Sequence, residues 1–220
     1  MSIKTNLEDI KATIPEHVTL VAVSKTKPVS DLMAAYNAGQ RIFGENKIQE
    51  MADKYAEMPK DIQWHMIGHV QRNKVKYMAE FVSLIHGVDS FKLLKEIDKQ
   101  AKNHDRIIKC LLQIKIAEED SKFGMSVNDA TTLLQSDEFS ELKNIKVVGL
   151  MGMATFTDNM TQVEKEFKSL NNTFSELKNT NSDLEIKSMG MSGDYQLAIE
   201  CGSTMVRVGS SIFGARNYNN

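Results

Sequence analysis

The chain has 220 residues, of which 41% are hydrophobic and 25% are charged. These proportions are typical of a folded globular protein and exclude a fibrous or largely disordered chain. Its 27 Lys and Arg residues against 29 Asp and Glu residues give a formal net charge of -2, so no overall basic field favours nucleic acid as a partner.

Two further features of the sequence indicate the cellular compartment of the protein. No apolar run approaches the roughly 18 residues needed to cross a bilayer, and the N-terminus lacks the pattern of a secretion signal. Cys110 and Cys201 are far apart and fit neither a disulfide framework nor a zinc site. We therefore expect a cytoplasmic protein with no membrane association.

Eight short apolar or β-branched runs predict strands, each separated from the next by a stretch with helical spacing. The predicted strands are, in chain order, 18–24, 41–44, 62–67, 81–87, 107–116, 145–151, 184–189 and 204–209. The predicted helices are 6–12 before the first strand, then 30–38, 47–57, 72–79, 91–103, 128–135, 162–178 and 195–200. Ser90 and Ser126 precede two of these helices and are expected to cap them.

Repeated strand and helix units suit either a closed barrel or an open doubly wound sheet. The barrel is favoured, because no G-x-G-x-x-G motif follows the first strand. The turns rich in Gly and Ser instead follow the seventh and eighth strands, where barrels commonly bind phosphate. We predict one domain over residues 1–220, a (β/α)8 TIM-type barrel with an extra N-terminal helix.

Lys25 follows the apolar first strand, which places it at the carboxyl-end mouth of a barrel. Partial burial there would lower the pKa of its amine from about 10.4, and a neutral amine can attack an aldehyde. The alternative is an ordinary surface lysine.

A phosphate cradle is predicted from segments 188–194 and 206–211, which contain Gly190, Ser192, Gly209 and Ser210. Glycine lets backbone N–H groups approach an anion closely, and serine hydroxyls add donors. The alternative is two tight turns that need glycine for backbone reasons alone.

Two further polar residues belong to the predicted mouth. Arg207 lies within an apolar strand, where an unpaired guanidinium would be costly, so it is expected to contact either a ligand or a carboxylate such as Glu45. Asn46 follows the second strand and is interpreted either as a ligand donor or as a helix cap. His65 and His86 are interpreted as hydrogen-bonded core histidines, and no metal-ligand pattern is found.

Four blocks of sequence together resemble the pyridoxal phosphate homeostasis protein family, which is related to the barrel domain of alanine racemase. The blocks are VAVSKTK at 21–27, FGEN at 43–46, WHMIG at 64–68, and GMSGD at 190–194 with GSTMVRVGSSIFG at 202–214. They keep their order, and the resemblance covers nearly the whole chain.

The resemblance implies that Lys25 carries pyridoxal 5′-phosphate as an internal aldimine. It likewise implies that Ser192, Gly209 and Ser210 hold the phosphate, and that Arg207 faces the pyridine nitrogen. A permanently charged guanidinium cannot accept the proton of that nitrogen, so the cofactor would be a weak electron sink.

The family also implies a role in storing, buffering or delivering the cofactor, with apoenzymes that depend on pyridoxal phosphate as recipients. The second domain that supplies a tyrosine in alanine racemase has no counterpart before Asn220, so we expect no turnover and a monomer. The alternatives are a slow amino-acid racemase or decarboxylase using the same cofactor, and a Schiff-base aldolase using Lys25.

Overall fold

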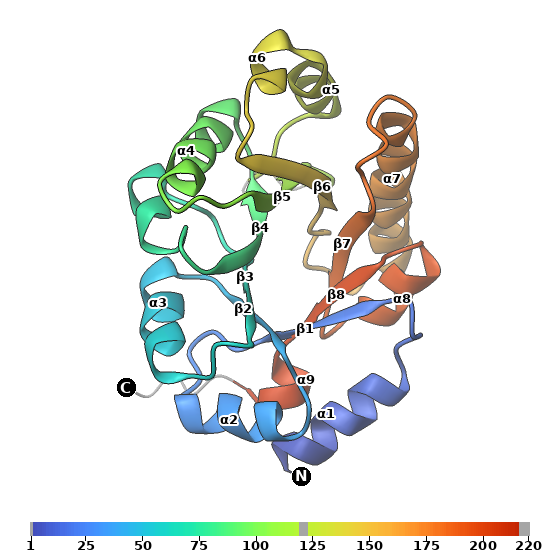
Figure 1. Ribbon diagram of the computed structural model, residues 1–220. Helices are drawn as coiled ribbons and strands as arrows, with labels where there is room; N and C mark the ends of the chain where they lie inside the picture. The colour runs from blue at the N-terminus through green and yellow to red at the C-terminus, as the bar shows by residue number, and fades with distance from the viewer. Residues whose placement is uncertain (1, 119–122, 216–220) are drawn as a thin grey trace.

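The protein folds as a closed barrel of eight parallel strands, seen in a computed structural model that describes residues 2–118 and 123–215. The strands follow one another around the barrel in chain order, and β1 pairs with β8 to close it (Figure 1). They are β1 (Thr19–Val23), β2 (Ile42–Glu45), β3 (Gln63–Met66), β4 (Val82–Val88), β5 (Ile108–Gln113), β6 (Ile145–Met151), β7 (Ile186–Met191) and β8 (Met205–Val208). The predicted fold class is confirmed.

Helices surround the barrel and connect successive strands (Figure 1). They are α1 (Ile3–Ala12), α2 (Val29–Asn37), α3 (Ile48–Glu57), the 3-10 helix η1 (Arg72–Tyr77), α4 (Phe91–Lys102), α5 (Val127–Gln135), α6 (Asp137–Ser140), α7 (Met160–Lys178), α8 (Tyr195–Glu200) and α9 (Ser210–Phe213). Within the described ranges, none of these helices is long and apolar enough to cross a membrane.

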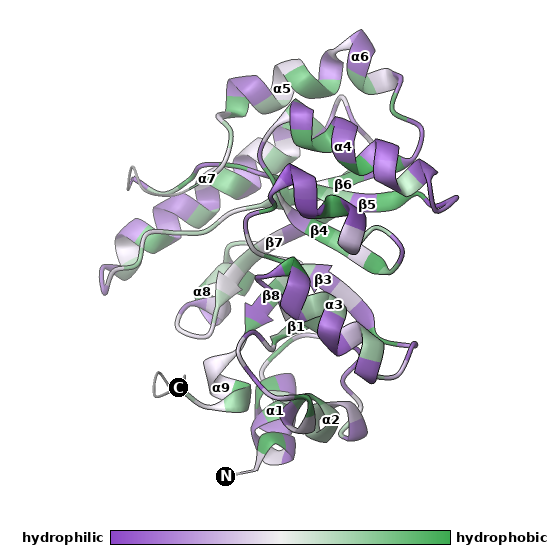
Figure 2. Ribbon diagram, turned by 90° about the vertical axis from the view of Figure 1, so that its left-hand side faces the viewer, coloured by the Kyte–Doolittle hydropathy of each residue, from purple (hydrophilic) through white to green (hydrophobic). Residues whose placement is uncertain are grey.

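The hydropathy of each element matches its place in the barrel. Figure 2 shows helices banded with both polar and apolar residues, whereas strands such as β5 and β6 are largely apolar. In α4, for example, Leu93, Leu94, Ile97 and Ala101 are buried, and this spacing puts them on one face of the helix. Ser90 accepts a hydrogen bond from the Leu93 N–H at 3.4 Å, so the predicted cap is confirmed.

A small apolar cluster, separate from the main hydrophobic core, lies inside the barrel and forms the floor beneath its mouth. It contains Val21, Leu84, Leu111, Val148, Met151 and Met205, contributed by five different strands. Side chains alternate along a strand, so Arg207 faces the same side as Met205, and Gln113 the same side as Leu111. Polar side chains therefore lie directly above this floor, at the carboxyl ends of the strands.

The two ends of the described chain meet beside β1. Helices α1 and α9 pack against each other (Figure 1), and Asn6 donates through Nδ2 to the Ile212 carbonyl at 3.0 Å. Lys27 donates to the Phe213 and Ala215 carbonyls at 2.8 and 3.0 Å. The segment after β8 is thereby fixed against the segment after β1.

Some predicted elements were wrong in type or extent. The helix predicted over 72–79 is the 3-10 helix η1, whose greater rise per residue suits a short connection between β3 and β4. The strand predicted over 107–116 ends at Gln113; after it, the Ile114 N–H donates to the Met151 carbonyl at 2.9 Å and Ile114 forms an isolated bridge with Met125. Helices α6 and α9 were not predicted, because four residues carry no periodicity that a sequence pattern can reveal.

Candidate functional site

A pocket of about 620 Å³ opens at the carboxyl ends of the strands, within the size range of small-molecule sites. All six residues predicted to bind the cofactor line it, namely Lys25, Asn46, Ser192, Arg207, Gly209 and Ser210. They come from the loops after β1, β2, β7 and β8, from β8 itself and from the first residue of α9. This is the face on which barrels of this type carry their active sites.

Lys25 enters the pocket from the turn that follows β1. The strand ends at Val23, Ser24 is buried, and Lys25 is half-buried in the pocket wall. The Lys27 N–H donates to the Ser24 carbonyl at 3.1 Å and closes the turn. Lys25 is thus half-buried and lines the cavity, and its role as the reactive amine stays a prediction.

The loops after β7 and β8 meet at one side of the pocket. The Gly209 N–H donates to the Ser192 hydroxyl at 3.1 Å, so the two loops are hydrogen-bonded to each other. A hydroxyl that accepts this bond keeps its own proton for donation to a ligand. Ser210 begins α9 directly after Gly209.

Gly190 is required by the backbone of this region. Its φ is +98°, and a Cβ atom there would lie 2.6 Å from the Ala198 Cβ. Gly190 is therefore needed for the backbone of a tight turn, which was the alternative interpretation of this segment. Ser192 and Gly209 line the pocket, which is where the predicted phosphate cradle places them.

Arg207 is held inside the barrel by three donated hydrogen bonds. Its Nη1 donates to the Ser188 carbonyl and hydroxyl at 2.8 and 2.6 Å, and its Nη2 donates to the Gly152 carbonyl at 3.1 Å. Burial lowers the pKa of the guanidinium to about 10, so it stays charged at neutral pH. Among the described residues these contacts use three of its five N–H groups and leave two for a ligand.

The alternative prediction, that Arg207 pairs with Glu45, is wrong. Glu45 pairs instead with Lys54, whose Nζ lies 2.7 Å from Glu45 Oε1. Asn46 does not cap α3 either, since the cap position is Lys47 and no side-chain cap bond is made there. Asn46 remains as a polar residue of the pocket wall.

Two buried histidines connect Arg207 to the barrel interior. His86 Nδ1 lies 2.9 Å from the Ser188 hydroxyl, and His86 Nε2 lies 3.1 Å from His65 Nδ1. Burial lowers the pKa of His65 to about 3 and lowers that of His86 well below its ordinary value. Both rings are therefore neutral, and their interpretation as hydrogen-bonded core histidines is confirmed.

This burial predicts a pH dependence of stability. The pKa of His65 is about 3 in the folded protein and about 6.5 when unfolded. Between these values the unfolded state binds a proton that the folded state does not, so stability falls as pH falls below about 6.5. We expect His65→Phe to reduce the slope of unfolding free energy by up to about 1.4 kcal/mol per pH unit, measured by urea unfolding between about pH 7 and pH 5.

The exposed His104 gives the control for this experiment. The variant His104→Asn is expected to keep the slope of the wild-type protein, because that side chain is in solvent. An unchanged slope in His65→Phe would contradict the neutral, buried state of His65.

The sequence analysis missed several residues of the pocket. Gln113 ends β5 and donates to the Phe123 carbonyl at 2.9 Å, and the Phe123 ring stacks on His69 with centroids 4.3 Å apart. Phe156 also lines the mouth and is 93% exposed. Gln113 carried the same signal as Arg207, a polar residue within a predicted apolar strand, whereas no pattern marked the two phenylalanines.

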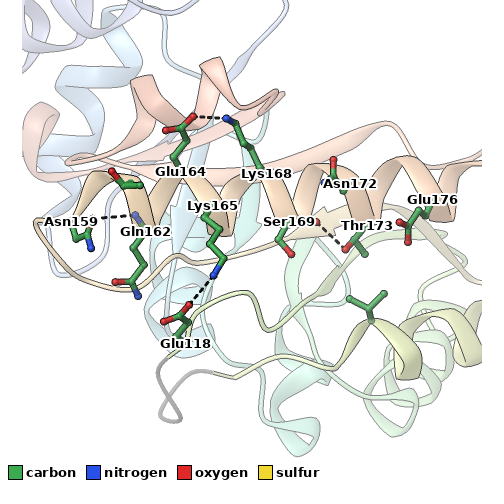
Figure 3. A pocket seen from close by; sticks show the side chains of 12 residues that line it. Glu118, Asn159, Gln162, Glu164, Lys165, Lys168, Ser169, Asn172, Thr173 and Glu176 are labelled. Carbon is green, nitrogen blue, oxygen red and sulfur yellow. Dashed lines mark hydrogen bonds and ion pairs between the residues drawn. The ribbon is translucent and has the colours of Figure 1, made fainter.

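A second hollow of about 960 Å³ runs along α7 (Figure 3). Its charged groups pair with each other at the surface, as in Lys165 with Glu118 at 3.5 Å and Lys168 with Glu164 at 2.5 Å. Lys165 and Glu118 are 78% and 64% exposed, so they offer a ligand little desolvation. Over residues 2–118 and 123–215, no cluster of three or more His, Cys, Asp or Glu side chains is arranged to hold a metal ion. The barrel mouth is therefore the candidate site.

The fold and the site together define a barrel of the alanine racemase N-terminal domain class. The profile of that domain family matches residues 1–217 of the chain. Alanine racemase of Clostridium difficile superposes with a TM-score of 0.78, at 14% identity, over 99% of this chain and 58% of that one, which supports the fold alone.

Relatives with higher sequence identity identify one family within this class of barrel. The pyridoxal phosphate homeostasis protein of Pasteurella multocida is 38% identical over the full length of both chains, and that of Escherichia coli K12 is 35% identical over 93% of this chain and 88% of its own. PipY of Synechococcus elongatus, solved with pyridoxal phosphate bound, has a TM-score of 0.88 at 34% identity over 97% of this chain and 100% of its own. The chain belongs to the pyridoxal phosphate homeostasis protein family.

Proposed function

We propose that this protein binds pyridoxal 5′-phosphate at the barrel mouth and serves its homeostasis by storing, buffering or delivering it, without turnover. The observation that carries the proposal is the convergence of Lys25, the two loops after β7 and β8, and Arg207 on one pocket. The names of the relatives and the bound ligand of PipY support it.

The chemistry of the pocket fits the cofactor. The Ser192 hydroxyl accepts from Gly209 and so has a proton to donate, and Ser210 adds a second hydroxyl beside it. These groups would bind the phosphate, with Asn46 as a further donor. Lys25 provides the primary amine, and pyridoxal 5′-phosphate supplies an aldehyde that condenses with such an amine when bound.

Arg207 supports a role in storage. Its guanidinium can donate a hydrogen bond to the pyridine nitrogen but does not transfer the proton, so the pyridine nitrogen stays unprotonated. Electron withdrawal by the ring is then weak, which disfavours carbanion chemistry at an amino acid. The contacts to Ser188 and Gly152 hold the guanidinium in this orientation.

The finer points of the proposal concern partners and location. Pyridoxal 5′-phosphate can pass to an apoenzyme when an amine of that apoenzyme replaces the Lys25 amine on the aldehyde carbon. Apoenzymes that depend on this cofactor are therefore the proposed recipients. We also propose that residues 1–220 form one domain and that the protein acts as a monomer. Cys110 and Cys201 are free and buried, as in a reducing cytoplasm.

The proposal is tested by adding pyridoxal 5′-phosphate to the purified protein, recording the visible absorption spectrum, and then reducing with borohydride. Peptide mass mapping is expected to place a pyridoxyl adduct on Lys25. An adduct found only at other lysines would overturn the assignment of the site.

The absence of turnover needs a separate measurement. The protein loaded with cofactor is incubated with each amino acid in deuterated water, and exchange of the α-hydrogen is followed by NMR. No exchange is expected above that of free cofactor. Exchange at an enzymatic rate would favour the racemase alternative, and a protein that takes up no coloured cofactor would favour the aldolase.

A further inference from the structure

A buried cluster of charged groups lies directly behind the turn that carries Lys25. At its centre is Lys54 of α3, whose side chain is 7% exposed. Its Nζ donates to Glu45 Oε1 at 2.7 Å, to Glu50 Oε1 at 2.8 Å and to the Ser24 carbonyl at 2.8 Å. An ammonium group has three N–H donors, so these contacts use all of them.

The cluster holds the residue on each side of Lys25. On one side, Ser24 accepts from Lys54 through its carbonyl and donates through its hydroxyl to Glu45 Oε1 at 2.6 Å. On the other side, the Thr26 N–H donates to Glu50 Oε1 at 2.5 Å. The backbone before and after Lys25 is thus fixed to one group of side chains, while the Lys25 side chain lines the pocket.

Thr26 adopts a backbone conformation that these contacts must enforce. Its φ is +64°, and Asp105 is the one other non-glycine residue of the described ranges with a positive φ. Thr26 occupies the third position of the turn closed by Lys27 and Ser24, where a positive φ favours glycine. A β-branched residue is strained there, and such strain persists only where the surroundings over-determine the conformation.

Stability does not account for the cluster. Glu45 is fully buried, burial raises the pKa of its carboxyl, and its Oε2 has no hydrogen-bond partner among the described residues. Buried ion pairs of this kind contribute little net stability, because desolvation offsets the attraction between the charges. The contacts to Ser24 and Thr26 point instead to the geometry of Lys25.

Resting on the proposed function, we propose that Lys54, Glu45 and Glu50 are positioning residues that direct Lys25 Nζ toward the aldehyde carbon of the cofactor. In the step they assist, the Nζ forms a double bond to that carbon. The carbon–oxygen bond breaks, and the oxygen leaves as water with the two protons of the neutral amine. A lysine held in the right orientation reacts faster than one that must first find it.

The test separates the covalent step from binding in the pocket. Pyridoxine 5′-phosphate carries an alcohol in place of the aldehyde, so its affinity reports the phosphate and ring contacts alone. We expect Glu50→Ala to slow formation of the covalent bond with pyridoxal 5′-phosphate by roughly 10- to 100-fold, while the Kd of pyridoxine 5′-phosphate stays within about twofold. Stopped-flow absorbance and calorimetry measure the two quantities.

Two further variants of the same position sharpen the result. Glu50→Gln keeps an oxygen that can accept from the Thr26 N–H and should restore most of the rate. Glu50→Asp keeps the charge but is too short to bridge Thr26 and Lys54, and should be slow like Glu50→Ala. Glu164→Ala is the matched control, because it removes an equivalent lysine–glutamate pair four residues apart on the exposed surface of α7.

Each outcome decides the proposal. Equal losses for the two ligands in Glu50→Ala would assign the cluster a merely structural role and overturn positioning, as would an unchanged rate. If Glu50→Ala does not fold, the comparison of Glu50→Asp with Glu50→Gln gives the same decision. A wild-type protein that forms no adduct on Lys25 overturns the proposed function, and positioning with it, which distinguishes that failure from a failure of positioning alone.

Discussion

Replacing Lys25 by alanine is expected to abolish the pyridoxyl adduct that borohydride reduction leaves on the protein. The side chain is half-buried in the pocket wall, so the fold should lose no more than about 1 kcal/mol of stability. Loss of the carbon–nitrogen bond should weaken retention of pyridoxal 5′-phosphate by on the order of 100-fold, which corresponds to about 2.7 kcal/mol. Equilibrium dialysis and the visible spectrum measure this loss.

Lys27 provides the matched control for this substitution. It lies two residues along the chain and lines the same pocket, but its Nζ donates to the Phe213 and Ala215 carbonyls. We expect Lys27→Ala to keep the adduct on Lys25 and to weaken the attachment of the segment after β8. An adduct of equal stoichiometry in Lys25→Ala would contradict the assignment of the reactive amine.

The barrel could be predicted because most of its strands are apolar runs that differ in composition from the segments on either side. Val18 to Val23 and Ile145 to Met151 are such runs, and the helices between strands show a period that strands lack. What the pattern could not show is where a strand stops pairing. β5 ends at Gln113 although Ile114 and Ile116 continue the apolar sequence, because pairing depends on the neighbouring strands.

The site was predictable where one polar residue interrupts or ends an apolar strand. Lys25, Asn46 and Arg207 all carry this signal, and all three line the pocket. In the cluster around Lys54 only Glu45, at the end of β2, carries this signal, and nothing in the sequence marks Lys54 or Glu50. A lysine four residues after a glutamate on a helix is usually an exposed pair, and only the packing of α3 against the Lys25 turn buries it.

Arg207 makes hydrogen bonds within the barrel in addition to its proposed contact with the ligand. We expect Arg207→Met to lower the free energy of unfolding of the protein without cofactor by about 3 kcal/mol. The substitution leaves the buried Gly152 carbonyl without its donor and removes two donated bonds from Ser188, whose carbonyl keeps only the bond from the Gly152 N–H. Because Arg207 is the proposed donor to the ring nitrogen, the substitution is also expected to weaken binding of pyridoxine 5′-phosphate by roughly tenfold.

Ser188→Ala separates these two roles of Arg207. It removes the hydroxyl between Arg207 Nη1 and His86 Nδ1 but keeps the carbonyl contacts, so the guanidinium stays charged and close to its place. The expected loss is about 1 kcal/mol in urea unfolding, with ligand affinity close to wild type. If Arg207→Met were as stable as the wild-type protein, its buried hydrogen bonds would contribute nothing. If its affinity for pyridoxine 5′-phosphate were unchanged, the guanidinium would not face the ring nitrogen, and the weak electron withdrawal that favours storage over turnover would lose its structural cause.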